Sequence, residues 1–297
     1  MFKHLRESIE WIRRESARKY LHSHAQGLVN RYPQMVCYSF DFIATDINID
    51  GRYDQAELDF LEKMLAGQSA GKTILDVGAN IGNHALAFSN LATRVIAFEP
   101  HPRTVQLLRL NTEHRPNVEI VALGASDRAE TVRALSSGVN LGASTITDRP
   151  AGEGEISWSF DVRPLDSLDW RSWGDIAVVK IDVEGHEPQA IRGATKLLEA
   201  NRPIVLLEQN PEAIHDGTSE SLELLRTIGY RHFATLVNEL PWRTPQRLPR
   251  ALRQAGRLAE SALFGPPTEA VRLVPVQRLE NRNYNVLIAS FDPIEAV

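Results

Sequence analysis

The sequence has one cysteine, Cys37, and this scarcity excludes several kinds of site. A single cysteine cannot form an intrachain disulfide or supply a cysteine metal cluster. Because nothing favours an oxidising compartment, we expect a cytosolic, cytoplasmic protein. Long apolar runs are also missing from the N-terminus, where charged residues recur every few positions. We therefore expect no secretory signal and no integral membrane segment.

Excess positive charge is absent as well. The formal net charge of the 297 residues is -5, which gives no overall attraction for a phosphate backbone, so we expect no nucleic-acid partner. The remaining composition is ordinary, with 43% hydrophobic and 24% charged residues. These values predict a folded chain with one principal domain.

The first residues predict a short basic amphipathic helix within an N-terminal helical extension over 1–70. Its apolar residues fall roughly on one helical face, namely Phe2, Leu5, Ile9, Ile12 and Tyr20. We expect this helix to pack as a cap on the catalytic domain. Peripheral membrane contact is the alternative interpretation.

From Lys72 onward, short β-branched runs alternate with helix formers, a pattern that predicts an α/β fold with a doubly wound, mostly parallel sheet. The expected strands are Thr73–Val77, Arg94–Phe98, Val118–Leu123, Ile176–Ile181 and Ile204–Glu208. The segment Ala134–Asp161 is rich in Ser, Gly, Thr and Asp. It is expected to be an irregular loop that folds over a ligand.

The C-terminal part predicts two further strands, Tyr230–Val237 and Asn283–Ser290, which we expect to pair as a hairpin. A proline-bounded insertion at 241–275, with a helix near Arg250–Leu263, separates them. Arginines recur in it at spacings of three or four, at Arg243, Arg247, Arg250, Arg253 and Arg257. They form either a solvated face or a surface for an acidic ligand.

A tight glycine turn follows the first strand and reads Asp76-Val77-Gly78-Ala79-Asn80-Ile81-Gly82. Cofactors bind at such strand-to-helix turns in α/β proteins. Gly78 and Gly82 would let the backbone approach a ligand, and Asn80 tolerates the left-handed conformation well. The pattern D-x-G-x-N-x-G departs from the dinucleotide fingerprint, and Asp76 could hold the ammonium of an amino-acid moiety.

Glu99 ends the second strand, and a carboxylate at this place can accept both hydroxyls of a ribose. It would also repel a phosphate on that ribose, which disfavours NADP. The simpler interpretation is that Glu99 caps the helix that begins near Pro102.

The loop DVGANIG, the strand end AFEP, the turn GASD at 124–127 and the run VKIDVEGHE at 179–187 together resemble the FkbM family of S-adenosylmethionine-dependent methyltransferases. The resemblance implies a seven-stranded, Rossmann-like class I methyltransferase sheet with a reversed last strand, over 71–297. It implies S-adenosyl-L-methionine as cofactor. The positions that would bind it are Asp76, Gly78, Asn80, Gly82, Glu99, Ser126 and Asp127.

The segment after the fourth strand carries the residues expected at the reaction centre. Alternation places Lys180, Asp182 and Glu184 on one side of an extended chain. Such a cluster could provide a general base, or oxygen ligands for a divalent cation such as Mg²⁺ with Glu208 as a further ligand. His186 is another candidate base, because imidazole titrates near neutral pH. Asp182, Glu184 and His186 are therefore the expected catalytic residues.

We expect O-methylation of a hydroxyl on a small-molecule acceptor, a saccharide or a polyketide-like metabolite. The alternatives are an NAD-dependent oxidoreductase or epimerase, a nucleic-acid methyltransferase and a non-catalytic cofactor-binding module. The first conflicts with the glycine turn, and the second with the negative charge and the missing Asp-Pro-Pro-Tyr run. The third conflicts with the acids after the fourth strand.

Overall fold

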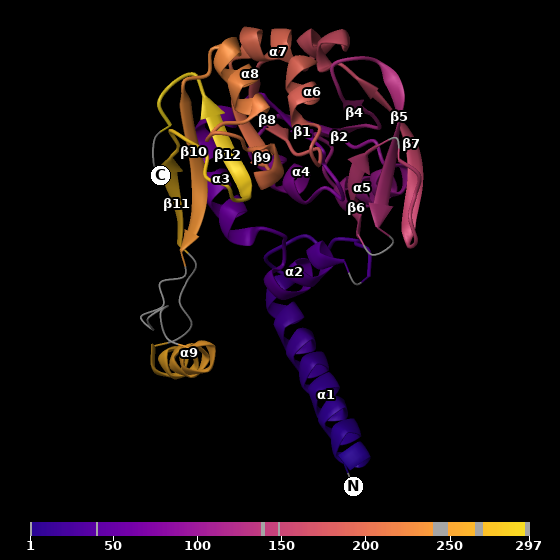
Figure 1. The fold of residues 1–297 in the computed structure, drawn as a ribbon, viewed down its shortest axis with the longest axis vertical. Helices are drawn as coiled ribbons and strands as arrows, with labels where there is room; N and C mark the ends of the chain where they lie inside the picture. The colour runs from indigo at the N-terminus through magenta and orange to yellow at the C-terminus, as the bar shows by residue number, and fades with distance from the viewer. Residues whose placement is uncertain are drawn as a thin grey trace.

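The computed structural model describes residues 2–39, 41–137, 140–147, 149–239, 249–264 and 270–294. A large sheet with helices on both faces forms the body, a smaller sheet lies at one side, and α1 extends away from both (Figure 1). The α/β, doubly wound fold class predicted from the alternating pattern is confirmed.

The large sheet has eight strands in the order β11-β10-β12-β9-β8-β1-β2-β3. Their bounds are β1 Thr73–Val77, β2 Arg94–Phe98, β3 Val118–Val121, β8 Ile176–Ile181, β9 Ile204–Gln209, β10 His232–Glu239, β11 Ala270–Pro275 and β12 Tyr284–Ser290. Strands β1, β2, β3, β8 and β9 run parallel to their neighbours among themselves. β12 pairs antiparallel with both β9 and β10, which is the expected reversed last strand.

The sheet has one strand more than the seven expected. β11 comes from the end of the predicted insertion and pairs antiparallel with β10 at the sheet edge. The insertion also contains α9 (Arg250–Phe264). Arg243 and Arg247 lie outside the described residues, as do the side chains of Arg250 and Arg253, so the expected arginine face stays a prediction.

Alternating side chains of the central strands point to opposite faces, as a sheet buried on both sides requires. Leu75 and Val179 pack with the helices of one face, and Ile74 and Val178 pack with those of the other. The first face is covered by α6 (Glu187–Arg192), α7 (Thr195–Asn201) and α8 (Glu220–Ile228). The second is covered by α3 (Gln55–Ser69), α4 (Asn83–Phe88) and α5 (Pro102–Thr112).

The expectation of an irregular loop at Ala134–Asp161 is wrong. A second sheet occupies this region, in the order β4-β7-β5-β6. Its strands are β4 Gly124–Ala125, β5 Glu130–Ser137, β6 Asn140–Ile146 and β7 Glu155–Arg163. Serine and threonine suit the exposed face of a strand, so their abundance does not exclude a sheet. Alternating Trp158, Phe160 and Val162 in β7 carry the period-two signal that composition concealed.

The N-terminal extension divides into an outlying helix and a segment that belongs to the body. α1 (Phe2–Leu28) projects from the molecule (Figure 1), and Ile9, Ile12 and Tyr20 are 42%, 56% and 53% exposed. The expected packing of this helix as a cap is therefore wrong. α3, in contrast, buries Leu61 and Leu65 against the sheet. Within the described residues, no helix combines the length and hydropathy needed to cross a bilayer.

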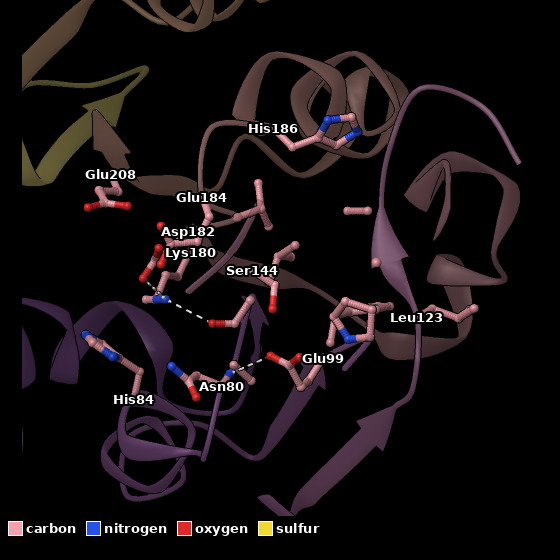
Figure 2. Close-up of a pocket in the computed structure, with 18 of the residues that line it drawn as sticks. Asn80, His84, Glu99, Leu123, Ser144, Lys180, Asp182, Glu184, His186 and Glu208 are labelled. Atoms are coloured by element: carbon pink, nitrogen blue, oxygen red, sulfur yellow. Dashed lines mark hydrogen bonds and ion pairs between the residues drawn. The ribbon is translucent and has the colours of Figure 1, made fainter. Parts of the chain in front are cut away.

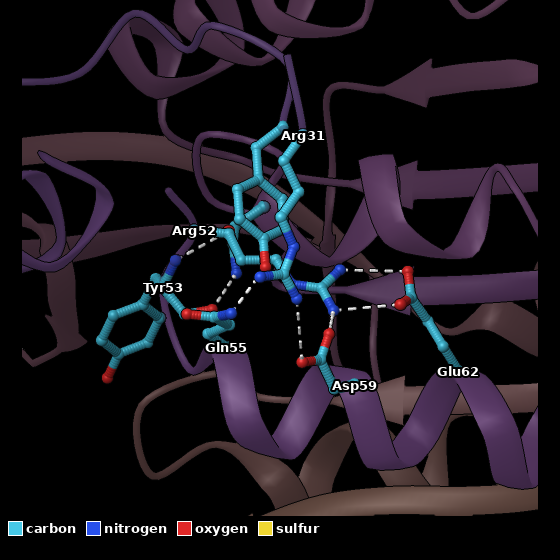
Figure 3. Close-up of polar contacts among 8 residues, drawn as sticks. Arg31, Arg52, Tyr53, Gln55, Asp59 and Glu62 are labelled. Atoms are coloured by element: carbon cyan, nitrogen blue, oxygen red, sulfur yellow. Dashed lines mark hydrogen bonds and ion pairs between the residues drawn. The ribbon is translucent and has the colours of Figure 1, made fainter. Parts of the chain in front are cut away.

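An ionic network fixes the connection between α2 (Phe42–Asp50) and α3. Arg52 donates to the carboxylates of Asp59 and Glu62 on α3, and its bonds to Glu62 are 3.0 Å long (Figure 3). The side chain of Arg52 is only 11% exposed, whereas those of Asp59 and Glu62 are 38% and 26% exposed, so the network is screened by solvent less than a fully exposed pair would be. The backbone of Tyr53, the next residue, is thereby held in place above the sheet.

The turns after β1 and β8 approach each other closely. Gly78 has a φ of +83°, and a Cβ at this position would lie 1.8 Å from the carbonyl oxygen of Asp182. The amide of Asp182 in turn donates to the carbonyl of Val77 at 3.0 Å. Only glycine allows this contact, because both its backbone conformation and its missing side chain are required.

Gly78→Ala tests this close approach, with Gly71→Ala as its control. Gly71 has a similar φ of +77°, but no atom lies within 4 Å of its added Cβ. We expect Gly71→Ala to lower the free energy of unfolding by about 1–2 kcal/mol through backbone strain. Gly78→Ala should lower it by about 1–3 kcal/mol more, because the two turns must separate. Urea denaturation measures both values, and equal losses would contradict the contact.

Candidate functional site

A pocket of about 1100 Å³ lies where the central strands end (Figure 2). It is lined by the turn after β1, the end of β2, the segment after β3, strands β6 and β7, and the loop after β8. Ile43 and Tyr53 of the N-terminal extension complete the wall. The carboxyl edge of an open α/β sheet is the usual place for ligands, so this pocket is the candidate site.

The glycine turn forms one side of the pocket. Asn80 has a φ of +49°, which confirms that this position needs a left-handed residue. Its backbone amide donates to Glu99 at 2.9 Å, whereas its side-chain oxygen is buried and has no hydrogen-bond partner among the residues that the structure describes (Figure 2). Gly82 has a φ of +96°, which side chains rarely adopt, and a Cβ there would lie 2.7 Å from a methyl group of Leu108, which would have to shift. Gly78 and Gly82 thus serve internal packing, rather than only an approach to a ligand.

Glu99 presents a buried carboxylate whose orientation is fixed by the backbone. Its two oxygens accept hydrogen bonds from the amides of Asn80, at 2.9 Å, and His101, at 2.8 Å. Burial raises the pKa of Glu99 to about 7, although these two bonds act in the opposite direction. Glu99 lines the pocket, and the second lone pair of each oxygen is left for a ligand. The side-chain cap of α5 is His101, which accepts from the amide of Thr104.

Asp76 does not occupy the place expected for it. Its side chain is completely buried and does not line the pocket. Asp76 lies opposite Lys180 in the register of β1 and β8, and one carboxylate oxygen is 3.5 Å from the Lys180 ammonium. Burial raises the pKa of Asp76, and the charge of Lys180 counteracts this rise. The cation held by Asp76 is thus a lysine of the protein itself.

Lys180 joins the carboxyl groups at the centre of the site. Its ammonium contacts Asp182 at 3.0 Å and the carbonyl of Gly78 at 3.5 Å (Figure 2). Burial alone would lower the pKa of Lys180, but Asp182 and Asp76 raise it above its usual value. The same ammonium keeps the pKa of Asp182 below its ordinary value despite the burial of that group. Lys180 and Asp182 are therefore both charged at neutral pH.

Glu208, at the end of β9, is the protonated partner in this cluster. Burial and then the charge of Asp182 raise the pKa of Glu208 to about 9. A side-chain hydrogen bond links the two carboxyl groups. Because Glu208 carries the proton at neutral pH, it donates to the Asp182 carboxylate.

The loop after β8 is held in a constrained conformation. Glu184 has a φ of +54° and Gly185 a φ of +92°. The carboxylate of Glu187 accepts from the amides of Val183 and Gly185, both at 3.1 Å. Desolvation in the pocket, followed by the charge of Asp182, raises the pKa of Glu184 to about 7, although Glu184 is an exposed residue. Glu187, the last acid of the K-x-D-x-E-G-x-E run, thus fixes the loop.

His186 lies away from the acids with which the sequence grouped it. Its Nε2 is 3.0 Å from the hydroxyl of Ser126, at the end of the pocket beside β4 (Figure 2). Ser126 is 1% exposed, and Asp127 contacts Arg192 at 3.6 Å. Neither residue lines the pocket, whose wall here is formed by Gly124 and Ala125.

Among the lining residues that sequence reasoning did not find are Tyr53 and His84. Tyr53 is held by Asn83, whose side chain accepts from the Tyr53 amide at 3.1 Å and donates to its carbonyl at 2.9 Å. His84 follows Asn83 on α4, and burial lowers its pKa to about 3, so it is uncharged. No motif marks either residue: Tyr53 reaches the site through the packing of the N-terminal extension, and His84 lies in the first turn of the helix after the glycine turn.

The acids do not form a metal site in the part of the chain that the structure describes, where no group of three His, Cys, Asp or Glu residues is placed to hold an ion. The ammonium of Lys180 lies among them instead. The expected option of a divalent cation has no support from this geometry.

A curated relative gives a first comparison with known proteins. The chain is 30% identical over 150 residues to the hexuronic acid methyltransferase AglP of Haloferax volcanii. The match covers 49% of this chain and 59% of the relative, so the chain spans less than two thirds of that protein's length.

Solved structures give more distant matches. The precorrin-6y C5,15-methyltransferase of Geobacter metallireducens GS-15 has 16% identity and a TM-score of 0.40, over 78% of this chain and 87% of that one. The methyltransferase FkbM of Methylobacillus flagellatus KT has 17% identity and a TM-score of 0.33, over 62% and 46%. Neither likeness informs the choice of acceptor.

The family model gives the decisive match. The methyltransferase FkbM domain covers residues 76–232, more than half of the chain. This span begins at Asp76 of the glycine turn, includes the whole Lys180 cluster, and ends in β10. The chain belongs to the FkbM family of methyltransferases.

Proposed function

We propose that this methyltransferase uses S-adenosyl-L-methionine and transfers its methyl group to a hydroxyl of a saccharide or a polyketide-like metabolite. The observation that carries the proposal is the buried Glu99 carboxylate, which two backbone amides aim into the pocket beside the glycine turn. A ribose diol matches this acceptor, and the acids of the Lys180 cluster lie across the same pocket.

The residues of the pocket fit this cofactor. Glu99 would accept the ribose hydroxyls, and the unpartnered side-chain oxygen of Asn80 would accept from the ammonium of the amino-acid end. Gly124 and Ala125, which follow β3, would lie beside the adenine. Asp76, being buried behind the turn, would act only through Lys180.

The other candidate functions explain fewer of these contacts. Glu99 would repel a phosphate on the ribose, and the turn lacks the glycine pattern of a pyrophosphate cradle. A non-catalytic binding module would not need the Lys180, Asp182 and Glu208 cluster, whose carboxyl groups are held at different protonation states.

When bound, the cofactor supplies an electrophilic methyl group for in-line displacement. The protein then has to orient the acceptor hydroxyl and take its proton. Asp182 remains a carboxylate at neutral pH and can accept a hydrogen bond from this hydroxyl. The pKa of Glu184, about 7, suits a general base at neutral pH. His186, bound to Ser126, is less well placed for this role.

Titration calorimetry with S-adenosylhomocysteine and with NAD tests the cofactor. Binding of the former alone is expected, and binding of NAD alone would overturn the proposal. Methyl-labelled cofactor added to fractionated polysaccharides, lipids and metabolites then tests the acceptor. Label found only in protein or nucleic acid would exclude a small-molecule hydroxyl.

Glu99→Gln should weaken binding of S-adenosylhomocysteine about 10- to 100-fold, because a charge-assisted hydrogen bond to the ribose is lost. Glu113→Gln, at an exposed position after α5, is the matched control and should bind like the parent. Calorimetry gives both dissociation constants. If the Glu99 variant bound S-adenosylhomocysteine as tightly as the parent, Glu99 would not be the residue that binds the ribose.

The affinity for S-adenosylhomocysteine should depend on pH through Glu99. The carboxylate form accepts the ribose hydroxyls, and the pKa of free Glu99 is about 7. Lowering the pH therefore makes binding compete with protonation, and from pH 8 to pH 6 the affinity should fall about tenfold. The fall should be absent in Glu99→Gln, and a parent protein with constant affinity over this range would contradict the assignment.

Asp182→Asn and Glu184→Gln should lower kcat by about 10²- to 10⁴-fold, because they remove groups that orient the hydroxyl or accept its proton. Their affinity for S-adenosylhomocysteine should stay within a factor of about three, since the ribose contact of Glu99 is intact. Single-turnover kinetics with labelled cofactor measures the first effect. Folded variants with the parent rate would show that these acids are not catalytic.

A further inference from the structure

A recess of about 580 Å³ opens beside the candidate cofactor pocket. It shares Tyr53, His84, Lys180, Asp182 and Glu208 with that pocket, so the two are continuous around the acid cluster. Its other lining residues include Asp54, Asn283 and Asn285, and His186 is not among them. In Figure 2 the shared residues His84 and Glu208 lie on the side opposite His186. A cofactor bound against Glu99 would leave this recess for the acceptor.

The recess is rich in carboxyl groups and poor in cations. Asp54, Asp182 and Glu208 line it, and Lys180 is the one cationic side chain among the described lining residues. Lys180 is already engaged by Asp76 and Asp182. Burial keeps His84 uncharged, with its pKa lowered to about 3. An acceptor anion in the recess would therefore face carboxylates without a free cation to balance its charge.

The same groups suit the hydroxyls of an uncharged ring. A carboxylate accepts from hydroxyls, and the protonated carboxyl of Glu208 can also donate to one. The Tyr53 ring offers an apolar wall, and Asn283 and Asn285 add amide groups at the far side, where they bond to each other at 2.9 Å. A pocket of this kind gives both contact area and orientation.

Asp54 is the acid lining the recess that has no direct contact with Lys180, Asp182 or Glu208 among the hydrogen bonds and ion pairs of the described residues. It has a left-handed φ of +52° and makes no side-chain bond to the helix that it precedes. Its position is set by the neighbouring Tyr53, which Asn83 clamps, and by the Arg52 network (Figure 3). Burial, followed by nearby acids, raises the pKa of Asp54 to about 7. It thus adds a negative charge to the recess at mildly alkaline pH.

We propose that the recess receives the acceptor as an uncharged polyol ring, and that Asp54 selects against acceptors that carry a carboxylate or phosphate there. This inference rests on the proposed function. The proposal predicts an acceptor that differs from a hexuronic acid, the compound in the name of the relative. A carboxylate on the acceptor would be repelled in this recess. Asp54 precedes the family-matched residues 76–232, so this selection would be a property of the N-terminal extension.

The experiment uses the full chain at pH 8, where Asp54 is ionised. Binding of S-adenosylhomocysteine is measured first, and its failure would affect the proposed function rather than this inference alone. The saturated protein is then titrated with methyl glycosides of glucose, galactose and mannose and with the matched methyl glycosides of their uronic acids. We expect at least one neutral glycoside to bind, about tenfold or more tightly than its uronate partner.

Asp54→Asn tests the selecting residue, since asparagine tolerates the left-handed conformation. We expect this variant to reduce the preference for the neutral partner at least threefold without changing the affinity for S-adenosylhomocysteine. Asp50→Asn, the same change at an exposed position of α2, should keep the parent preference. Tighter binding of uronates by the parent, no binding of any neutral glycoside, or an unchanged preference in Asp54→Asn would overturn the proposal.

Discussion

The buried ammonium of Lys180 is the interaction on which the site depends. Lys180 lies in β8, and its ammonium is 3.5 Å from Asp76 in the neighbouring β1 and 3.0 Å from Asp182, which follows β8. Without this cation, the completely buried Asp76 would have no opposite charge nearby and would be repelled by Asp182, whose side chain is 36% exposed. With it, Asp182 stays charged while Glu208 keeps its proton. Lys180 thus keeps Asp182 charged, and burial together with this negative charge keeps the neighbouring Glu208 protonated.

The fold was largely accessible from the sequence because its central strands have strong local signals. β1, β2 and β8 begin and end at the expected residues, since each is a short apolar run between turn formers. The smaller sheet was missed because its serine and threonine content resembles that of a loop. In β7, the alternation of Trp158, Phe160 and Val162 would have revealed it.

The site was only partly accessible, for a different reason. The left-handed Asn80 and the inward Glu99 follow from local sequence. The partner of Asp76 does not, because Lys180 lies opposite it only through the register of two strands that are far apart in the chain. Tyr53 and Asp54 are harder still, since they enter the site by tertiary packing alone. Short-range patterns cannot report such contacts.

The loop after β8 is ordered by contacts within the protein itself. Glu184 and Gly185 both have positive φ, and Glu187 binds the amides on either side of Glu184. These residues therefore lose their conformational entropy when the chain folds, and not when an acceptor binds. Because the loop is preorganised, its carboxyl groups are already in position before an acceptor binds. Binding therefore costs little additional free energy for ordering the loop.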